Sequence, residues 1–160
     1  MLADFVASPA SQTAQLAEAH VLALRLYSTA AFHSLNAPLR DKQRTGSHPY
    51  AATVFFLADG IKKLRAVEAA RAEAARDKRA EDADGSLDLW RGMRNRGAAD
   101  KFLKLGGTEP ALMSTTSDLA IAVQYGLSSH SLLFKLRTTS FMTRGADSAR
   151  AGPDHSPYAP

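Results

Sequence analysis

A cluster of basic side chains follows the single tryptophan of this chain. Between positions 91 and 104, Asp100 is the only acid, and the bases are Arg91, Arg94, Arg96, Lys101 and Lys104. This local excess of positive charge fits a phosphate-bearing small ligand at least as well as a polyanion. Trp90 and Phe102 are the only rings nearby, so the aromatic spacing that favours single-stranded nucleic acid is weak. We therefore expect no nucleic-acid partner.

Other residue types that could do chemistry give weaker patterns. No cysteine is present, and the five histidines (at 20, 33, 48, 130 and 155) lack metal-ligand spacing, so we expect no metal. Gly106 and Gly107 favour a turn over a phosphate loop, because no Lys-Ser/Thr pair follows them. The hydroxyl run at 114–117 can be either strand surface with a helix cap or part of a ligand site.

Helical patterns occupy the first half of the chain. Ser8 before Pro9 is typical of a helix start, and residues 9–35 read as helical up to 36–38, where the proline is expected to end or kink the region. A second helix is predicted from Ser47 or His48 as cap to about residue 80. Its apolar stripe has helical spacing and consists of Tyr50, Val54, Leu57, Ile61 and Leu64.

After Gly85 the pattern changes to short β-prone pieces. We predict strands at 87–91, 112–116 and 131–137, and a fourth at 138–144. Residues 118–125 predict a short helix capped by Thr116 or Ser117. Helices followed by strands indicate an α+β fold. We divide the chain into a helical region (1–84), a β core (85–147) and a disordered tail (148–160), which together form one domain.

Length and composition favour an intracellular globular protein. The chain has 160 residues, of which 45% are apolar, enough for a packed core. The longest apolar run, 54–58, is far too short to span a bilayer, and the first residues lack the pattern of a signal peptide. We therefore expect a cytoplasmic protein without a membrane partner.

Four motifs, taken together in this order, carry a family resemblance. They are LWRGM at 89–93, GGTE at 106–109, MSTTS at 113–117 and AIAVQY at 120–125. Their order and spacing resemble the arginine-specific mono-ADP-ribosyltransferases of the Arg-Ser-Glu type, and the likeness covers roughly residues 20–147. The resemblance implies a helical N-terminal part followed by a split β-sandwich, which is incomplete here. It also implies transfer of ADP-ribose from NAD, or from NADP, to an arginine of an acceptor protein.

The resemblance also implies roles for five residues. Arg91 would bind an NAD phosphate with its fork of donors, and the Gly92 backbone would approach the nicotinamide carboxamide. Ser114 and Thr115 match the start of the family's Ser-Thr-Ser motif, which shapes the site beside the nicotinamide ribose. Thr116 stands where the second serine is usual and preserves the hydroxyl.

The chain departs from the family in its glutamates. Glu109 is the last glutamate and precedes the serine motif, whereas the family carries a catalytic Glu-x-Glu on a later strand. We therefore assign no catalytic residue and expect a C-terminally truncated, catalytically impaired member of the family. Two alternatives are a non-catalytic NAD-binding pseudoenzyme and a helical protein-interaction module that uses residues 50–80.

Overall fold

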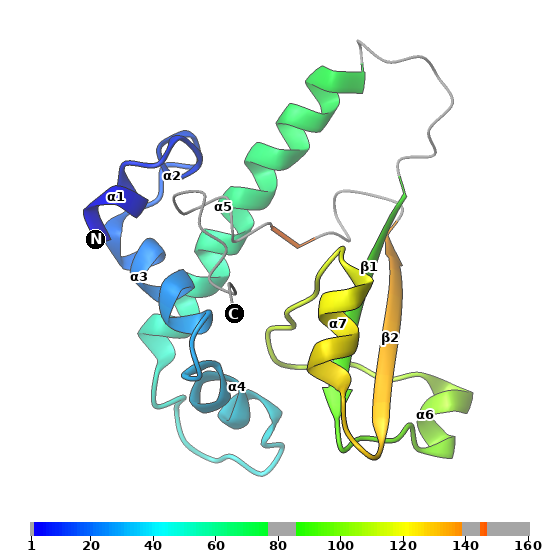
Figure 1. Cartoon of the computed structure of the whole chain (residues 1–160). Coiled ribbons are helices and arrows are strands. Elements are labelled where there is room, and N and C mark those ends of the chain that lie inside the picture. The colour runs from blue at the N-terminus through cyan, green and yellow to red at the C-terminus, as the bar shows by residue number, and fades with distance from the viewer. Residues whose placement is uncertain (1, 77–85, 139–144, 147–160) are drawn as a thin grey trace. The chain divides into compact units, whose positions relative to one another are not determined.

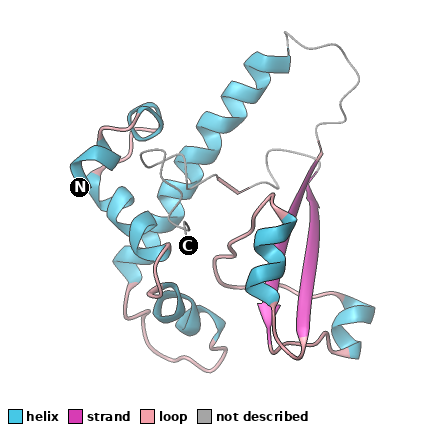
Figure 2. Cartoon of the chain, viewed as in Figure 1, coloured by secondary structure: helices cyan, strands magenta, loops and turns pink. Residues whose placement is uncertain are grey.

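A computed structural model of the chain describes residues 2–76, 86–138 and 145–146. The chain separates into two compact units, which we describe one at a time. The described part of the first unit is built from helices, and the second contains both strands and two further helices (Figures 1 and 2). The mixed α+β class is therefore confirmed. The described residues form one two-stranded sheet, so they do not show a split β-sandwich.

The helical unit begins with four short helices rather than one continuous segment. They are α1 (Leu2–Val6), α2 (Pro9–Thr13), α3 (Glu18–Tyr27) and α4 (Phe32–Arg40). The predicted start at Ser8 is confirmed, because its hydroxyl accepts the N–H of Ser11 at 3.3 Å. The chain leaves the helical path after α2, where Gln15 adopts a positive φ of 51°.

Of the two outcomes expected at residues 36–38, an end or a kink, the structure excludes the end. Helix α4 continues through Pro38 to Arg40, and its Leu35 and Asn36 are buried. Proline has no N–H to donate to the carbonyl four residues earlier, which belongs to Ser34. Because Ser34 is exposed, water can satisfy that carbonyl, and the buried neighbours keep the turn helical.

The long helix α5 (Ala51–Arg76) confirms the predicted second helix as far as the structure describes it, since residues 77–85 lie outside the described ranges. Its stripe is buried at Leu57 and Leu64, whereas Tyr50 precedes the helix and is 47% exposed. His48 supports the start: Nδ1 accepts the N–H of Tyr50, and Nε2 lies 2.9 Å from the carbonyl oxygen of Leu35. A carbonyl only accepts, so Nε2 carries the proton.

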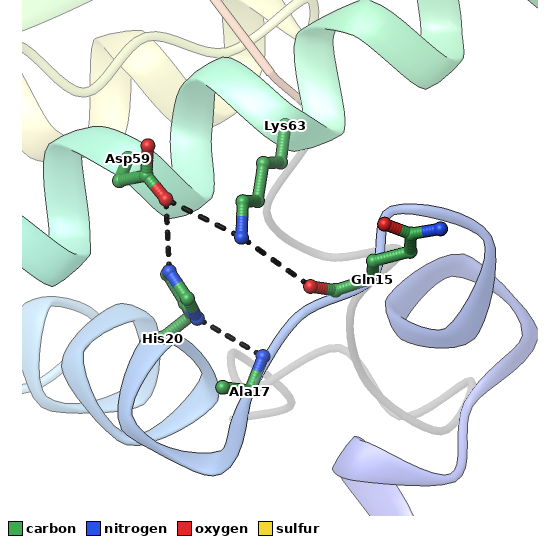
Figure 3. A network of polar contacts seen from close by, with 5 residues as sticks. All are labelled: Gln15, Ala17, His20, Asp59 and Lys63. Atoms are coloured by element: carbon green, nitrogen blue, oxygen red, sulfur yellow. Dashed lines mark hydrogen bonds and ion pairs between the residues drawn. The ribbon is translucent and has the colours of Figure 1, made fainter.

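A polar network joins α3 to α5 (Figure 3). Buried His20 accepts the N–H of Ala17 at Nδ1, 3.0 Å away, and donates from Nε2 to Asp59 at 2.9 Å. Lys63 lies 3.4 Å from both Asp59 and the carbonyl of Gln15. The hydrogen bond from His20, followed by Lys63, holds the pKa of Asp59 below its ordinary value, although burial acts in the opposite direction. These contacts give His20 a structural role in the helical unit.

Replacing His20 tests whether this network stabilises the helical unit. We expect His20→Ala to lower the free energy of unfolding by about 2–4 kcal/mol, because two partly buried hydrogen bonds and the ring packing on Phe56 are lost together. Urea unfolding followed by circular dichroism measures the change. His33→Ala, on an exposed histidine of α4, is the matched control. Equal effects of the two substitutions would contradict a stabilising role of the network.

The second unit is built on the antiparallel pair β1 (Leu87–Arg94) and β2 (Ser131–Thr138). The register runs from Leu87 opposite Thr138 to Arg94 opposite Ser131. The predictions of strands at 87–91 and 131–137 are thus confirmed, and β1 extends three residues further. The strand predicted at 138–144 lies outside the described residues, apart from Thr138, which ends β2. The predicted tail at 148–160 lies outside them entirely.

Two helices lie against opposite faces of this sheet. Helix α7 (Leu119–Gly126) confirms the helix predicted at 118–125, but its N-cap is Asp118 and not Thr116 or Ser117. It packs on Gly92, whereas the short helix α6 (Asp100–Leu105) places Phe102 against Phe134. Phe134 lies opposite Arg91, whose side chain points away from the face of Gly92. Helix α6 was not predicted; it ends at Gly106, whose φ of 71° agrees with the expected turn.

Candidate ligand-binding edge of strand β1

The edge of β1 that faces away from β2 carries one backbone contact with a distant segment. Trp90 and Thr116 exchange both hydrogen bonds, with N to O distances of 2.7 and 2.9 Å. In antiparallel pairing, the backbone groups of alternate residues point to the same edge. Gly92 lies two residues after Trp90, so its backbone N–H and C=O face the same edge of β1 that Thr116 contacts.

The side chain of Arg91 reaches across to this distant segment. Its Nη1 donates to the carbonyl oxygen of Ser114 at 2.7 Å. The structure thus brings Arg91, Ser114 and Thr116 together, with Gly92 adjacent in the strand. No other described residue accepts from the Arg91 guanidinium, so most of its donors are available to an anion.

The strand predicted at 112–116 is wrong, because this segment pairs with β1 only through the bridge at Thr116. Continued antiparallel pairing would make Gly92 and Ser114 the next pair to exchange hydrogen bonds. The carbonyl of Ser114 instead accepts from Arg91, and the pairing stops after a single bridge at Thr116. The Gly92 N–H and C=O therefore face an edge where no described residue pairs with them.

Gly92 is required by packing, independently of any ligand. A Cβ atom at this position would lie 1.8 Å from the carbonyl oxygen of Ala122 and 2.7 Å from the nitrogen of Gly126. Overlaps with backbone atoms cannot be relieved by a side-chain rotation. Helix α7 consequently contacts β1 backbone to backbone, and the predicted ligand role of Gly92 concerns only its main-chain groups at the edge.

Arg94 fixes the other end of α7, a role that sequence reasoning missed. Its Nε donates to the carbonyl of Tyr125 at 3.0 Å, and its Nη2 donates to that of Gln124 at 3.3 Å. A cation at the last carbonyls of a helix also complements the helix dipole. Arg94 and Gly92 are two residues apart, so their positions face the same side of the strand, the side of α7. The sequence could indicate this only once the strand itself had been assigned.

The three predicted hydroxyl residues differ in their surroundings. The Thr116 hydroxyl accepts the N–H of Asp118 at 3.1 Å and so helps to begin α7. Ser114 is exposed and Thr115 is half-buried, and their hydroxyls bond to no described residue. These two hydroxyls can therefore contact a ligand without breaking an internal hydrogen bond.

The carboxylates of this unit are mostly engaged in structural contacts. Asp88 lies 2.8 Å from Lys135 and 3.0 Å from Arg137, and Arg137 and then Lys135 lower its pKa to about 2. Glu109 accepts the N–H of Ala111, and Asp118 accepts those of Ala120 and Ile121. Among described residues 86–138, this leaves only Asp100, an exposed residue in the first turn of α6.

Comparison with known proteins finds no relative: no family model, no curated protein and no solved structure matches the chain. Among the described residues, no three His, Cys, Asp or Glu side chains are grouped to hold a metal ion. In the same ranges, no helix has the length and apolarity needed to cross a membrane.

The ion pairs of Asp88 predict a loss of stability in acid. The folded-state pKa of about 2 lies below the ordinary value of 3.8, so this stabilisation is complete above pH 3.8 and disappears as the pH falls towards 2. We expect Asp88→Asn to lower the melting temperature at neutral pH, with the difference from wild type shrinking below pH 3.8. Thermal unfolding across this range measures it. A difference that is constant with pH would contradict the assignment.

Proposed function

We propose that this chain binds NAD at the outer edge of β1 and is related to the arginine-specific ADP-ribosyltransferases. The observation that carries the proposal is the contact between Arg91 and Ser114, which lies beside edge groups of the Gly92 main chain that pair with no described residue. The remaining donors of the Arg91 fork, a backbone donor and acceptor, and two hydroxyls that bond to no described residue are adjacent at one strand edge. The order of motifs in the sequence supports the same reading.

Each group has a partner in the chemistry of the dinucleotide. The remaining donors of Arg91 suit the oxygens of a diphosphate. The N–H of Gly92 can donate to the carbonyl of the nicotinamide carboxamide, and its C=O can accept from the carboxamide NH₂. The carboxamide would then pair with β1 as a residue of a neighbouring strand does. Ser114 and Thr115 offer hydroxyls to the nicotinamide ribose. NADP fits the same groups, because none of them discriminates at the adenosine ribose.

Transfer chemistry has less support than binding. Cleavage of the nicotinamide–ribose bond develops positive charge on the sugar, which a carboxylate stabilises, and a second carboxylate takes a proton from the acceptor guanidinium. The described carboxylates near β1 hold the fold instead, and Asp88, with a pKa of about 2, is a poor base at neutral pH. We therefore propose a binding protein with impaired catalysis, and we assign no catalytic residue.

Arg91→Ala tests the proposed site directly. We expect wild type to bind NAD saturably and the variant to bind roughly 10- to 150-fold more weakly, because charge-assisted hydrogen bonds contribute about 1.5–3 kcal/mol. Isothermal titration calorimetry gives both dissociation constants. Arg96→Ala is the matched control, since Arg96 is an exposed arginine just beyond β1. Substitutions of Gly92 are unsuitable, because any side chain would displace α7.

Two results would overturn the binding proposal: no saturable binding of NAD by wild type, or equal weakening by Arg91→Ala and Arg96→Ala. A thermal melt of each variant shows whether loss of the contact with Ser114 has unfolded the unit. If Arg91→Ala is unfolded, Arg91→Lys keeps the charge but loses the fork, and should still weaken binding about tenfold.

The catalytic part of the proposal has a separate test. We expect the purified chain to transfer no ADP-ribose from labelled NAD to a small guanidino compound that imitates arginine. Mass spectrometry of that acceptor measures the transfer, with an active arginine-specific transferase as the positive control. Robust transfer by the wild-type chain would show that catalysis is intact, whatever the outcome of the binding experiment.

A second candidate function is a protein-interaction module built on α5. Phe55 is 64% exposed in the first turns of this helix, on the side opposite the buried Leu57. Phenylalanine is among the residues enriched in the cores of protein interfaces. Absence of NAD binding in the calorimetric experiment would favour this candidate over the first.

A further inference from the structure

The edge of β2 that faces away from β1 carries main-chain groups that no described residue uses. Trp90 of β1 directs both of its backbone groups to Thr116, away from β2. Its register partner Lys135 therefore directs its own N–H and C=O away from β1, and so does Leu133, two residues earlier. The main chain of these two residues bonds to no described residue. Helix α7 packs on Gly92 and leaves Leu133, which lies opposite Gly92, 41% exposed.

The charges that would protect this edge point back towards β1. A lysine on an edge strand usually discourages pairing with another chain. Here the Lys135 ammonium lies 2.8 Å from Asp88 and 5.2 Å from the centre of the Trp90 ring, and both of these residues belong to β1. Asp88 also holds the Arg137 guanidinium, at 3.0 Å. Strand β2 contains no proline and pairs with β1 without a bulge, so its outer edge lacks the usual features that prevent strand addition.

The side chains of β2 are arranged almost symmetrically about Phe134. Leu132 and Leu136 flank it on its own face of the strand, and Leu133 and Lys135 flank it on the other face. An antiparallel copy of β2 centred on Phe134 would therefore place leucine opposite leucine, and Leu133 opposite Lys135. Neither base of β2 would face a like charge. A register in which Lys135 faced its own copy would instead bring two ammonium groups together.

We propose that two copies of this chain associate through β2, antiparallel and with the two Phe134 residues facing each other. In this register Leu133 of one copy and Lys135 of the other exchange both backbone hydrogen bonds, and the two-fold axis repeats the exchange. The apolar side chains on the face of Phe134 continue across both strands. Assembly stops at two copies, because the outer edge of β1 is interrupted by its bridge to Thr116 and offers no second continuous edge.

A second copy fits this edge better than an unrelated extended peptide does. Such a peptide would gain the backbone hydrogen bonds but not the matched leucines on the face of Phe134. Pairing along one eight-residue strand buries less than the about 800 Å² per partner of a stable complex, so we expect a dimer of low affinity. The proposal is independent of NAD binding, because it uses neither Arg91 nor the outer edge of β1.

Sedimentation velocity of the full chain, from about 10 µM to about 1 mM, tests the association. We expect wild type to shift from monomer to dimer as the concentration rises. Leu133→Pro should weaken dimerisation at least about tenfold, because it removes an outward N–H from each copy without removing a hydrogen bond to β1. Leu133→Lys should weaken it at least about fivefold, because a lysine would face Lys135 of the other copy at both symmetric contacts. Leu26→Lys in α3 is the matched control, since Leu26 is 38% exposed.

Single cysteines test the register, because the chain has no cysteine of its own. Oxidised glutathione should link Phe134→Cys into a covalent dimer, since facing residues of a non-hydrogen-bonded pair have Cα atoms about 4.5 Å apart. Leu132→Cys is the control on the same face. In the proposed register it faces Leu136, and its own copy lies about 14 Å further along the strand, so it should link roughly tenfold more slowly or not at all.

Several outcomes would overturn the proposal. Wild type could stay monomeric over the whole concentration range or form assemblies larger than a dimer. Leu26→Lys could weaken association as much as Leu133→Lys, or the two cysteine variants could link equally fast. A thermal melt shows whether each variant is folded. If Leu133→Pro or Phe134→Cys is unfolded, Leu133→Lys and a mixture of Leu133→Cys with Lys135→Cys test the same contacts.

Discussion

The backbone exchange between Trp90 and Thr116 is the constraint on which the second unit depends. This single bridge ties β1 to a segment more than twenty residues later in the chain. It places the Ser114 carbonyl where Arg91 can reach it and Thr116 where its hydroxyl can begin α7. The pairing stops there, and among described residues none pairs with the Gly92 main chain at this edge. The proposed ligand edge is therefore an interrupted strand pairing.

Packing of α7 acts on the same strand from one face. The helix meets β1 without an intervening side chain at Gly92, and Arg94 holds its last carbonyls. Such contact leaves little freedom for the strand to shift, so the edge groups of Trp90 and Gly92 keep a defined spacing. A pre-formed arrangement of donors lowers the entropy lost on ligand binding. One glycine thus serves both the packing of the unit and the proposed contact with a carboxamide.

In the helical unit, some features follow from local sequence patterns and others depend on tertiary contacts. The cap at Ser8 and the apolar stripe of α5 are local, and both were readable from residue types and spacing. The break near Gln15 could not be predicted from local patterns. The segment is held by Lys63, which donates to the Gln15 carbonyl from α5, and by His20, which accepts the N–H of Ala17. Similarly, Pro38 predicts an end or a kink, and only the structure shows that the helix continues past it, with Leu35 and Asn36 buried.

The sequence by itself determined the α+β class, the cores of both strands, the helix before β2, and the residues proposed as the site. The strands and the helix follow from patterns within about ten residues, where side-chain periodicity and capping chemistry act directly. The site residues were proposed from the family resemblance. Only the tertiary structure decided that residues 112–116 make a single bridge, that Gly92 lies under α7, and that α6 forms with its leucines outward. These features depend on which distant group takes each hydrogen bond or fills each space, and no local pattern encodes that competition.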